Sequence, residues 1–189
     1  MFGFRVVGLT IAMLGASLGT SAGATAEPPA AGHSAPAFTY RLLNGKALAP
    51  KDLRGHPYIL WLVASWCSSC QAGSSVVGDH IAELRSRGVH VVEMRLAQDL
   101  GAPGPGLQQF EAAVGMNAAS PNWHWGELTQ AQTAALDPKG YADVYYLVNA
   151  SGIIVGVDGN PAASWDRINA FVSTVASRKM DHQQSGSRT

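Results

Sequence analysis

An apolar run followed at once by two closely spaced cysteines constrains this chain most. Residues 58–64 read YILWLVA, which is the pattern of a strand buried on both faces of a sheet. Cys67 and Cys70 follow within the segment WCSSC, and residues 68–87 are predicted to form a helix that Gly88 ends. Several glycines and serines give this helix a poor intrinsic propensity, so tertiary packing must hold it. The sequence therefore predicts a strand, a short turn that carries a cysteine pair, and a helix.

The rest of the domain, which we assign to residues 37–179, alternates strands and helices. Strands separated by helices imply right-handed crossovers and an α/β fold in which both faces of the sheet are covered. The expected elements are a hairpin around Asn44-Gly45, a strand over 89–96, a loop over 101–106, helices over 107–114 and 129–136, a hairpin of 144–148 with 153–157, and a helix that begins after Ser164.

The first 26 residues have the plan of a secretory signal peptide. A basic start is followed by the apolar run 6–14 and by small residues that contain two A-x-A cleavage patterns. An uncleaved anchor is the alternative, although the stretch is short and glycines interrupt it. We expect cleavage after Ala26, a periplasmic location, and no membrane span in the remaining chain. Residues 27–36 are predicted to be a flexible lead-in, and residues 180–189 a disordered tail.

Charge and cysteine content exclude several classes of protein. The chain has 13 basic and 13 acidic side chains and a formal net charge of +0, so no basic surface is available to neutralise nucleic-acid phosphates. Its two cysteines are too few for a small disulfide-stapled fold or for a four-thiolate zinc site. The cysteines are therefore expected to act as one pair.

The position of that pair favours redox chemistry. Unpaired N–H groups and the positive end of the helix dipole favour a thiolate, so we expect a lowered pKa for the Cys67 thiol. Cys70 lies about one helical turn later, within reach of a disulfide. The first thiolate can attack a substrate disulfide, and the second can resolve the mixed disulfide. A static disulfide is the alternative, but so short a loop constrains the unfolded chain little.

The segment 53–70, LRGHPYILWLVASWCSSC, resembles the thioredoxin superfamily and in particular its exported TlpA/ResA/DsbE-like branch. The hairpin near Asn44-Gly45 and the later segment YYLVNASGIIV extend the similarity over most of residues 36–177. The resemblance implies a thioredoxin-like fold, with a central mixed sheet flanked by helices and an N-terminal β-hairpin extension. It also implies a thiol-disulfide oxidoreductase with Cys67 as nucleophile, Cys70 as resolving thiol and no cofactor. Its partners would be a protein thiol or disulfide substrate and a redox partner protein, and we expect a monomer.

Three positions depart from the pattern of that superfamily. Asp143 stands where a cis-proline usually precedes the strand that faces the disulfide, and a non-proline peptide bond there should be trans. Trp61 occupies the place of the buried acid of classical thioredoxins. Residues 71–74 supply no glutamate after the second cysteine, so the proton acceptor for Cys70 is not identified from the sequence.

These departures raise a copper-binding alternative. Sco proteins share this fold, lack the cis-proline and bind copper through two cysteines and a histidine, a ligand set that suits Cu(I). The segment 120–126, SPNWHWG, resembles the tryptophan-containing segment of that family. However, Sco proteins separate their cysteines by three residues, and the position of their histidine corresponds here to Asp143. Copper delivery is therefore the secondary hypothesis, and we assign no metal ligand.

Two further residues are assigned to substrate binding, namely Trp66, which adjoins Cys67, and Asp143, for which a role in a turn is the alternative. His124 lies between two tryptophans and is interpreted as packing at an amphipathic edge, with metal or substrate contact as the alternative. The other histidines of the domain are interpreted as surface or hydrogen-bonded residues.

Overall fold

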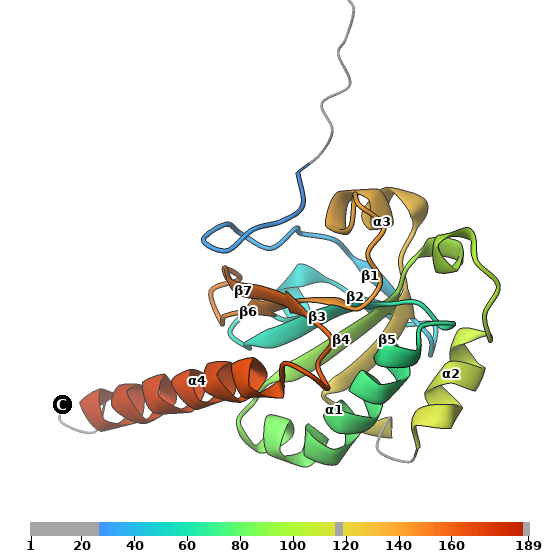
Figure 1. The fold of residues 1–189 in the computed structure, drawn as a ribbon. Helices are drawn as coiled ribbons and strands as arrows, with labels where there is room; N and C mark the ends of the chain where they lie inside the picture. The colour runs from blue at the N-terminus through green and yellow to red at the C-terminus, as the bar shows by residue number, and fades with distance from the viewer. Residues whose placement is uncertain (1–26, 116–118, 187–189) are drawn as a thin grey trace, which may run out of the picture.

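One seven-stranded sheet organises residues 27–115 and 119–186, the part of the chain that the computed structural model describes (Figure 1). The predicted signal peptide lies outside the described residues. Across the sheet the strand order is β2-β1-β5-β4-β3-β6-β7. The strands are β1 (Tyr40–Leu42), β2 (Ala47–Leu48), β3 (Tyr58–Val63), β4 (His90–Arg95), β5 (Trp123–Glu127), β6 (Val144–Val148) and β7 (Ile154–Gly159).

The sheet is mixed, as predicted. Strand β3 runs parallel to β4 and antiparallel to β6, and β4 runs parallel to β5. The N-terminal hairpin of β1 and β2 extends the sheet by pairing β1 antiparallel to β5. The predicted turn at Asn44-Gly45 connects the two strands of this hairpin, and Gly45 has the positive φ of 78° that such a turn requires. The most apolar segment of the sequence, β3, thus forms an interior strand of the sheet between β4 and β6.

Helices cover both faces of the sheet. Helices α1, α2 and α4 lie on one face, and α3 lies on the other (Figure 1). Their bounds are α1 (Ser68–Ser86), α2 (Leu107–Val114), α3 (Gln130–Leu136) and α4 (Trp165–Gly186), and two short 3-10 turns are η1 (Pro50–Asp52) and η2 (Ala97–Gly101). None of the described helices is both long and apolar enough to span a membrane.

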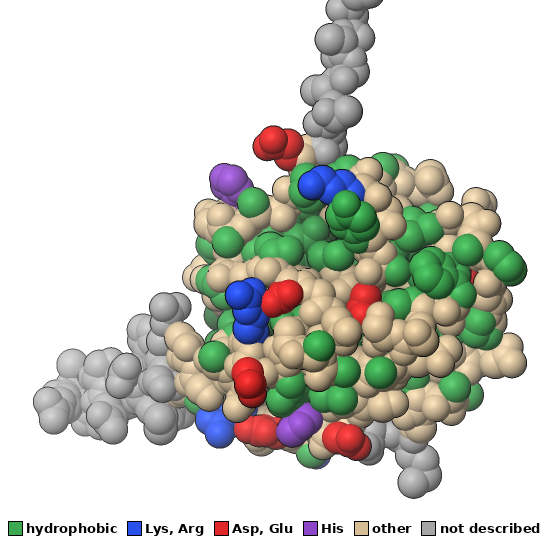
Figure 2. All heavy atoms as spheres, viewed as in Figure 1, with side chains coloured by type: hydrophobic (Ala, Val, Ile, Leu, Met, Phe, Trp, Pro, Cys, Tyr) green, Lys and Arg blue, Asp and Glu red, His purple; other side chains and the backbone are tan. Residues whose placement is uncertain are grey.

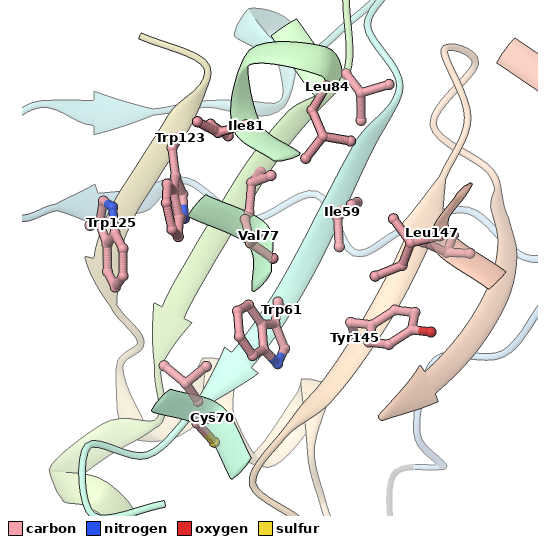
Figure 3. Close-up of a cluster of buried hydrophobic side chains, with 14 of the residues drawn as sticks. Ile59, Trp61, Cys70, Val77, Ile81, Leu84, Trp123, Trp125, Tyr145 and Leu147 are labelled. Carbon is pink, nitrogen blue, oxygen red and sulfur yellow. The ribbon is translucent and has the colours of Figure 1, made fainter. Parts of the chain in front are cut away.

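Alternation along β3 divides the core into two clusters. All six of its side chains are buried, because successive residues point to opposite faces and each face is covered. On one face Ile59 and Trp61 pack under Val77, Ile81 and Leu84 of α1 (Figure 3). On the other face Tyr58, Leu60 and Leu62 pack with side chains from β4, β6 and the N-terminal hairpin. This two-sided burial fixes the end of β3, from which the cysteine turn emerges.

Glycine at position 73 explains how a helix of low propensity packs so closely on the sheet. A Cβ atom built on Gly73 would lie 2.7 Å from Cη2 and Cζ2 of Trp61. That separation is well inside the van der Waals contact distance of carbon atoms. The bulky indole on β3 therefore requires a residue without a side chain at this point of α1.

The structure differs from the sequence predictions at three places. Strand β5 was not predicted, because the five-residue segment contains Gly126 and carries little more signal than alternating aromatic side chains. Residues 32–35, expected in the flexible lead-in, lie against the start of β7 through three backbone hydrogen bonds of 2.8–2.9 Å. Helix α4 extends to Gly186, beyond the predicted domain end at residue 179, because neither proline nor glycine interrupts it before that residue.

Charged side chains of both signs are scattered over the surface. On the face that Figure 2 shows, basic and acidic groups lie singly or in small mixed groups among apolar side chains. Several charges are in mixed pairs, such as Arg167 with Asp158 at 2.7 Å. The face in view therefore presents no continuous basic surface.

Candidate active site

The cysteine pair lies between the carboxyl end of β3 and the amino end of α1. Cys67 is the N-cap of α1, and its Sγ atom accepts a 3.1 Å hydrogen bond from the backbone N–H of Cys70. The two cysteines form a disulfide, with their Cα atoms 5.2 Å apart. Cys67 is 7% exposed and Cys70 is fully buried. Cys67 is therefore the more accessible of the two cysteines, and its place at the helix terminus favours negative charge on its sulfur.

Trp66 forms an exposed apolar surface beside the disulfide. Its side chain is 44% exposed, which is unusual for a tryptophan, and its Nε1 atom donates a 2.8 Å hydrogen bond to the backbone oxygen of Asp99. The indole is therefore held in one orientation while its face remains open to solvent. This geometry agrees with the substrate-binding role that the sequence suggests for Trp66, which stays a prediction.

A left-handed turn after β4 holds the residue that precedes Trp66. Gln98, Asp99 and Leu100 have φ values of 52°, 52° and 58°, a conformation that costs L-residues roughly 1–2 kcal/mol each. The turn places the Asp99 carboxylate where it accepts hydrogen bonds from the backbone N–H and the hydroxyl of Ser65, at 2.8 and 2.7 Å. An added Cβ at Gly104 would overlap Ser65 Oγ. The segment 97–106 thus fixes the turn that leads into the cysteines.

Asp143 lies directly before β6, with its carboxylate beside the disulfide. One of its oxygens and the two sulfur atoms of Cys67 and Cys70 lie within 4.8 Å of one another. Oδ1 accepts a 3.0 Å hydrogen bond from Nε1 of Trp61, whereas the buried Oδ2 has no hydrogen-bond partner. Burial raises the pKa of the Asp143 carboxyl, and the polar side chains of Ser69 and Trp61 partly oppose that rise. The described residues thus place one incompletely satisfied carboxylate at the cysteine pair.

The backbone of Asp143 is also unusual. Its φ is 74°, in the left-handed region that aspartate tolerates better than most residues, and the described peptide bonds are all trans. Its N–H donates to the backbone oxygen of Leu62, and its own oxygen accepts from the N–H of Asn160, at 2.8 and 2.9 Å. These two bonds fix the carboxylate against the end of β3. The expectation of a trans peptide bond at this position is confirmed.

Comparison with known proteins finds similarity in three-dimensional structure but none in sequence. No protein-family model and no curated protein matches the chain. A DsbE-type thiol:disulfide interchange protein from Chlorobium tepidum matches with a TM-score of 0.62 at 20% identity, over 78% of this chain and 99% of that one. A secreted disulfide oxidoreductase from Mycobacterium tuberculosis that is homologous to DsbE of E. coli matches with a TM-score of 0.56 at 22% identity, over 73% and 96%.

A third match belongs to the other group that the sequence resembles. BsSco, a member of the Sco family of cytochrome c oxidase assembly proteins, has a TM-score of 0.56 at 18% identity and covers 80% of this chain and 98% of that one. The strand order, the position of the cysteine pair and these matches agree. The chain has the thioredoxin fold. Both the predicted fold class and the predicted resemblance, including its weaker Sco component, are confirmed.

Within this thioredoxin fold, sequence reasoning missed a buried acid. Glu93 of β4 is fully buried and lies opposite Trp61 in the β3–β4 register, so an acid is present one strand away from the position that classical thioredoxins use. Its Oε2 atom accepts a 2.9 Å hydrogen bond from Nε1 of Trp123, and its Oε1 atom lies 2.7 Å from the hydroxyl of Ser74. Alternation along β4 gives Glu93 an inward position, which could have identified it from the sequence.

Burial favours the protonated form of Glu93, and its hydrogen-bond neighbours can accommodate that form. The Ser74 hydroxyl has one proton and two neighbours, since it lies 3.0 Å from the backbone oxygen of Cys70 as well as near Glu93. A protonated Glu93 can donate to Ser74 while Ser74 donates to Cys70. Burial raises the pKa of Glu93 to about 8, against the effect of its hydrogen bonds with Ser74 and Trp123. Ser74 therefore connects the side chain of Glu93 to the backbone of the buried cysteine.

The histidines lie elsewhere in the thioredoxin fold. His124 of β5 shares a 2.9 Å hydrogen bond with His90, and His90 contacts His56 edge to face with ring centroids 5.0 Å apart. His90 pairs with the first residue of β3, at the end opposite the cysteines. His124 is thus a hydrogen-bonded packing residue, as interpreted. In the described part of the chain, no histidine joins the cluster of Cys67, Cys70 and Asp143.

Proposed function

We propose that this chain is an exported thiol-disulfide oxidoreductase that acts on protein disulfides through its WCxxC segment. The observation that carries the proposal is the disulfide itself, in which Cys67 forms the N-cap of α1 and is slightly exposed, at 7%, while Cys70 is fully buried. A disulfide that served stability alone would gain little from this position, because it closes a loop of very few residues.

The reduced pair would react in two steps. The Cys67 thiolate attacks one sulfur of a substrate disulfide, a new S–S bond forms, and the other substrate sulfur leaves as a thiolate. Cys70 then loses its proton and attacks the Cys67 sulfur, which closes the Cys67–Cys70 disulfide and releases the second substrate thiolate. Two electrons pass to the substrate, and a dithiol redox partner must return them. The reverse direction uses the same steps.

Asp143 is the group best placed to accept the proton of Cys70. One of its carboxylate oxygens lies within 4.8 Å of both sulfurs, and its buried Oδ2 atom has no direct hydrogen-bond partner among the described residues, so the carboxylate can accept a new donor. Trp61 holds the other oxygen in place. Glu93 is held through Ser74 and lies farther along the hydrogen-bond chain, so we assign it a positioning role. This arrangement replaces the acids that the sequence lacks at position 61 and at residues 71–74.

Trp66 is proposed to dock the substrate. Its exposed indole belongs to the residue before Cys67 and is held by Asp99, so a peptide that presents its disulfide to Cys67 would pack against it.

The periplasmic location is proposed from the sequence of the first 26 residues. A monomeric state is also proposed, and light scattering of the processed protein tests it.

A glutathione redox titration of the processed protein, followed by alkylation of free thiols and mass measurement, tests the proposed function. A reversible two-electron transition between about −270 and −120 mV is expected, and its position would assign the protein as a reductant or an oxidant. A pair that stays oxidised throughout the titration would instead indicate a static disulfide. A Cys67→Ser, Cys70→Ser double variant provides the baseline for alkylation.

Copper delivery is not favoured by the geometry of the site. The two sulfurs could bind Cu(I), but the third group beside them is a carboxylate, which is a hard ligand, and not the imidazole that the Sco comparison requires. The similarity to BsSco concerns the fold, which the two groups share. The oxidoreductase is therefore the function that we propose.

A further inference from the structure

Three potential metal ligands meet at the cysteine pair. One atom each from Cys67, Cys70 and Asp143 lies within 4.8 Å of the other two, and all three residues are buried. Among the described residues, no other group of three histidine, cysteine, aspartate or glutamate side chains brings its ligand atoms so close together. One oxygen of the Asp143 carboxylate belongs to this cluster, Trp61 donates to Oδ1, and the buried Oδ2 has no direct hydrogen-bond partner among the described residues. The bond from Trp61 therefore orients a carboxylate that still has an oxygen available for a metal ion.

The charge of the reduced site is not balanced by the protein. If both thiols and the carboxyl ionised, three negative charges would share a buried site, which is unfavourable without a counterion. The ion pairs among the described residues involve other acids, namely Glu83, Asp99, Glu127 and Asp158. No basic side chain of the described residues pairs with Asp143. A divalent cation would neutralise two of the three charges.

We propose that reduction of the disulfide creates a binding site for one borderline divalent cation of the Zn²⁺ type, with Cys67 Sγ, Cys70 Sγ and a carboxylate oxygen of Asp143 as ligands. A tetrahedral zinc ion with Zn–S bonds of about 2.3 Å needs its two sulfurs about 3.8 Å apart. Sulfurs freed from a disulfide can reach that separation by side-chain rotation. The fourth position is left for water or for a substrate group, since three protein ligands leave one tetrahedral position open.

The ligand set selects the class of metal. Two thiolates suit Zn²⁺ and Cu(I), but a carboxylate oxygen suits Zn²⁺ far better than the soft Cu(I) ion. The N–H of Cys70, which already donates to Cys67 Sγ, would orient the first thiolate from behind. Replacement of histidine by aspartate at the third position therefore changes the preference of the site from copper towards zinc.

Binding and redox chemistry would exclude each other. Reduction by a dithiol breaks the S–S bond and adds two electrons and two protons to the pair, and binding of Zn²⁺ then releases two thiol protons. The same thiolates cannot attack a disulfide while they ligate the metal. This inference rests on the proposed function only in requiring a reducible pair. Zinc should accordingly inhibit thiol-disulfide exchange by the wild-type protein.

The test uses Co²⁺ as a coloured substitute for Zn²⁺ on the processed protein reduced with a phosphine. Alkylation of a separate portion of the sample first establishes that each chain has two free thiols. We expect one Co²⁺ per chain, with thiolate-to-cobalt charge-transfer bands and the visible bands of a tetrahedral site, and no binding by the oxidised protein. Zn²⁺ should remove these bands. Asp143→Asn keeps an oxygen for Trp61 and tolerates the left-handed backbone, and should weaken Zn²⁺ and Co²⁺ binding about tenfold or more.

Asp137→Asn is the matched control. Asp137 is also a buried aspartate whose Oδ2 atom lacks a hydrogen-bond partner, but it does not belong to the cysteine cluster. The Asp137→Asn variant should therefore bind Co²⁺ with the same affinity as the wild type. Equal Co²⁺ affinity and spectra for wild type and Asp143→Asn would overturn the proposal, as would an absence of one-to-one binding by protein with two free thiols. Cysteines that the phosphine cannot reduce would overturn both this inference and the proposed function, whereas normal exchange without metal binding would overturn the inference alone.

Discussion

The indole nitrogen of Trp61 lies 3.0 Å from Oδ1 of Asp143, so a side chain at the centre of β3 orients the carboxylate that faces the disulfide. Both residues depart from the superfamily pattern that the sequence resembles. The structure shows that the two departures are connected. Trp61 stands where classical thioredoxins have a buried acid, and its indole N–H donates to the carboxylate of Asp143, which lies directly before β6. Their substitutions should consequently have coupled effects.

Removal of the indole N–H should expose this coupling. Trp61→Phe leaves the buried Oδ1 atom of Asp143 without its donor, and we expect a loss of about 1–3 kcal/mol in the free energy of unfolding, measured with denaturant on the oxidised protein. The pH dependence of exchange should also shift, because the carboxyl loses a bond that favours its ionised form.

Trp125→Phe is the matched control for this measurement. Trp125 is also buried, but its Nε1 atom has no hydrogen-bond partner among the described residues, so the same substitution removes no hydrogen bond. It should cost less than Trp61→Phe and leave the pH profile unchanged. Equal losses for the two variants would show that only the volume of the ring matters.

Substitution of the buried cysteine should trap the substrate. With Cys70→Ser, Cys67 can still attack a substrate disulfide but no resolving thiol remains, so mixed disulfides should accumulate and be visible on non-reducing gels and by mass. Cys67→Ser should yield few or none, because Cys70 is fully buried. Trapping by both variants to the same extent would contradict the assignment of the nucleophile.

Replacement of Glu93 by glutamine should remove a pH dependence of stability. The pKa of Glu93 is raised to about 8 in the folded protein, so its contribution to stability is complete below the ordinary pKa near 4.5 and is lost as the pH rises towards 8. We expect the wild type to lose at least about 1 kcal/mol between pH 5 and pH 8, since one pKa unit corresponds to about 1.4 kcal/mol. Denaturant unfolding across this pH range measures the loss.

Glu93→Gln should be tolerated. The amide nitrogen can donate to Ser74, and the amide oxygen can accept from Trp123, which reproduces the bonds of the protonated acid. The variant should therefore be as stable as the wild type at pH 5 and more stable at pH 8. A variant destabilised at pH 5 would indicate that Glu93 is ionised in the folded protein.

A methyl group at position 73 should reverse the usual effect of replacing glycine in a helix. Alanine is favoured over glycine by about 1 kcal/mol in a helix interior. At Gly73, however, the added Cβ would meet the Trp61 ring at 2.7 Å, and we expect Gly73→Ala to destabilise the protein by about 1–3 kcal/mol. In the Trp61→Phe background these two ring atoms are absent and only Pro161 Cδ, at 3.1 Å, remains close, so the same substitution should cost clearly less than in the wild type. Without this rescue in a double-mutant cycle, the close contact would not be the cause.

The parts of the fold that the sequence predicts are those with a local signal. The apolar run of β3, the glycine that ends α1 and the asparagine-glycine turn each determine structure within a few residues, and the cysteine pair follows from its place between a strand and a helix. Strand β5 exists because its edge pairs with β4, and its five residues carry no comparable signal. Its position depends on contacts between segments far apart in the chain.

The two acids near the cysteine pair also combine features that the local sequence indicates with features that depend on distant contacts. Asp143 was singled out by its place in the superfamily pattern, but its left-handed backbone and its bond to Trp61 depend on residues more than 80 positions away. In the sequence Glu93 is one of a series of alternating residues, and only its inward position is indicated by that alternation. Its bonds to Ser74 and Trp123 connect three separate elements, so no single segment of the sequence indicates that it stays protonated.

The backbone at Asp143 also limits how this site can evolve. Proline has its φ fixed near −65° and carries no N–H, so it can adopt neither the φ of 74° nor the hydrogen bond to Leu62. A Cβ at Gly159 would lie 2.7 Å from the Asp143 oxygen, so that glycine is tied to the same conformation. A single substitution of Asp143 by proline is therefore incompatible with the observed backbone. Asparagine and glycine are the residues that tolerate this φ best, and of these only asparagine can still accept a hydrogen bond from Trp61.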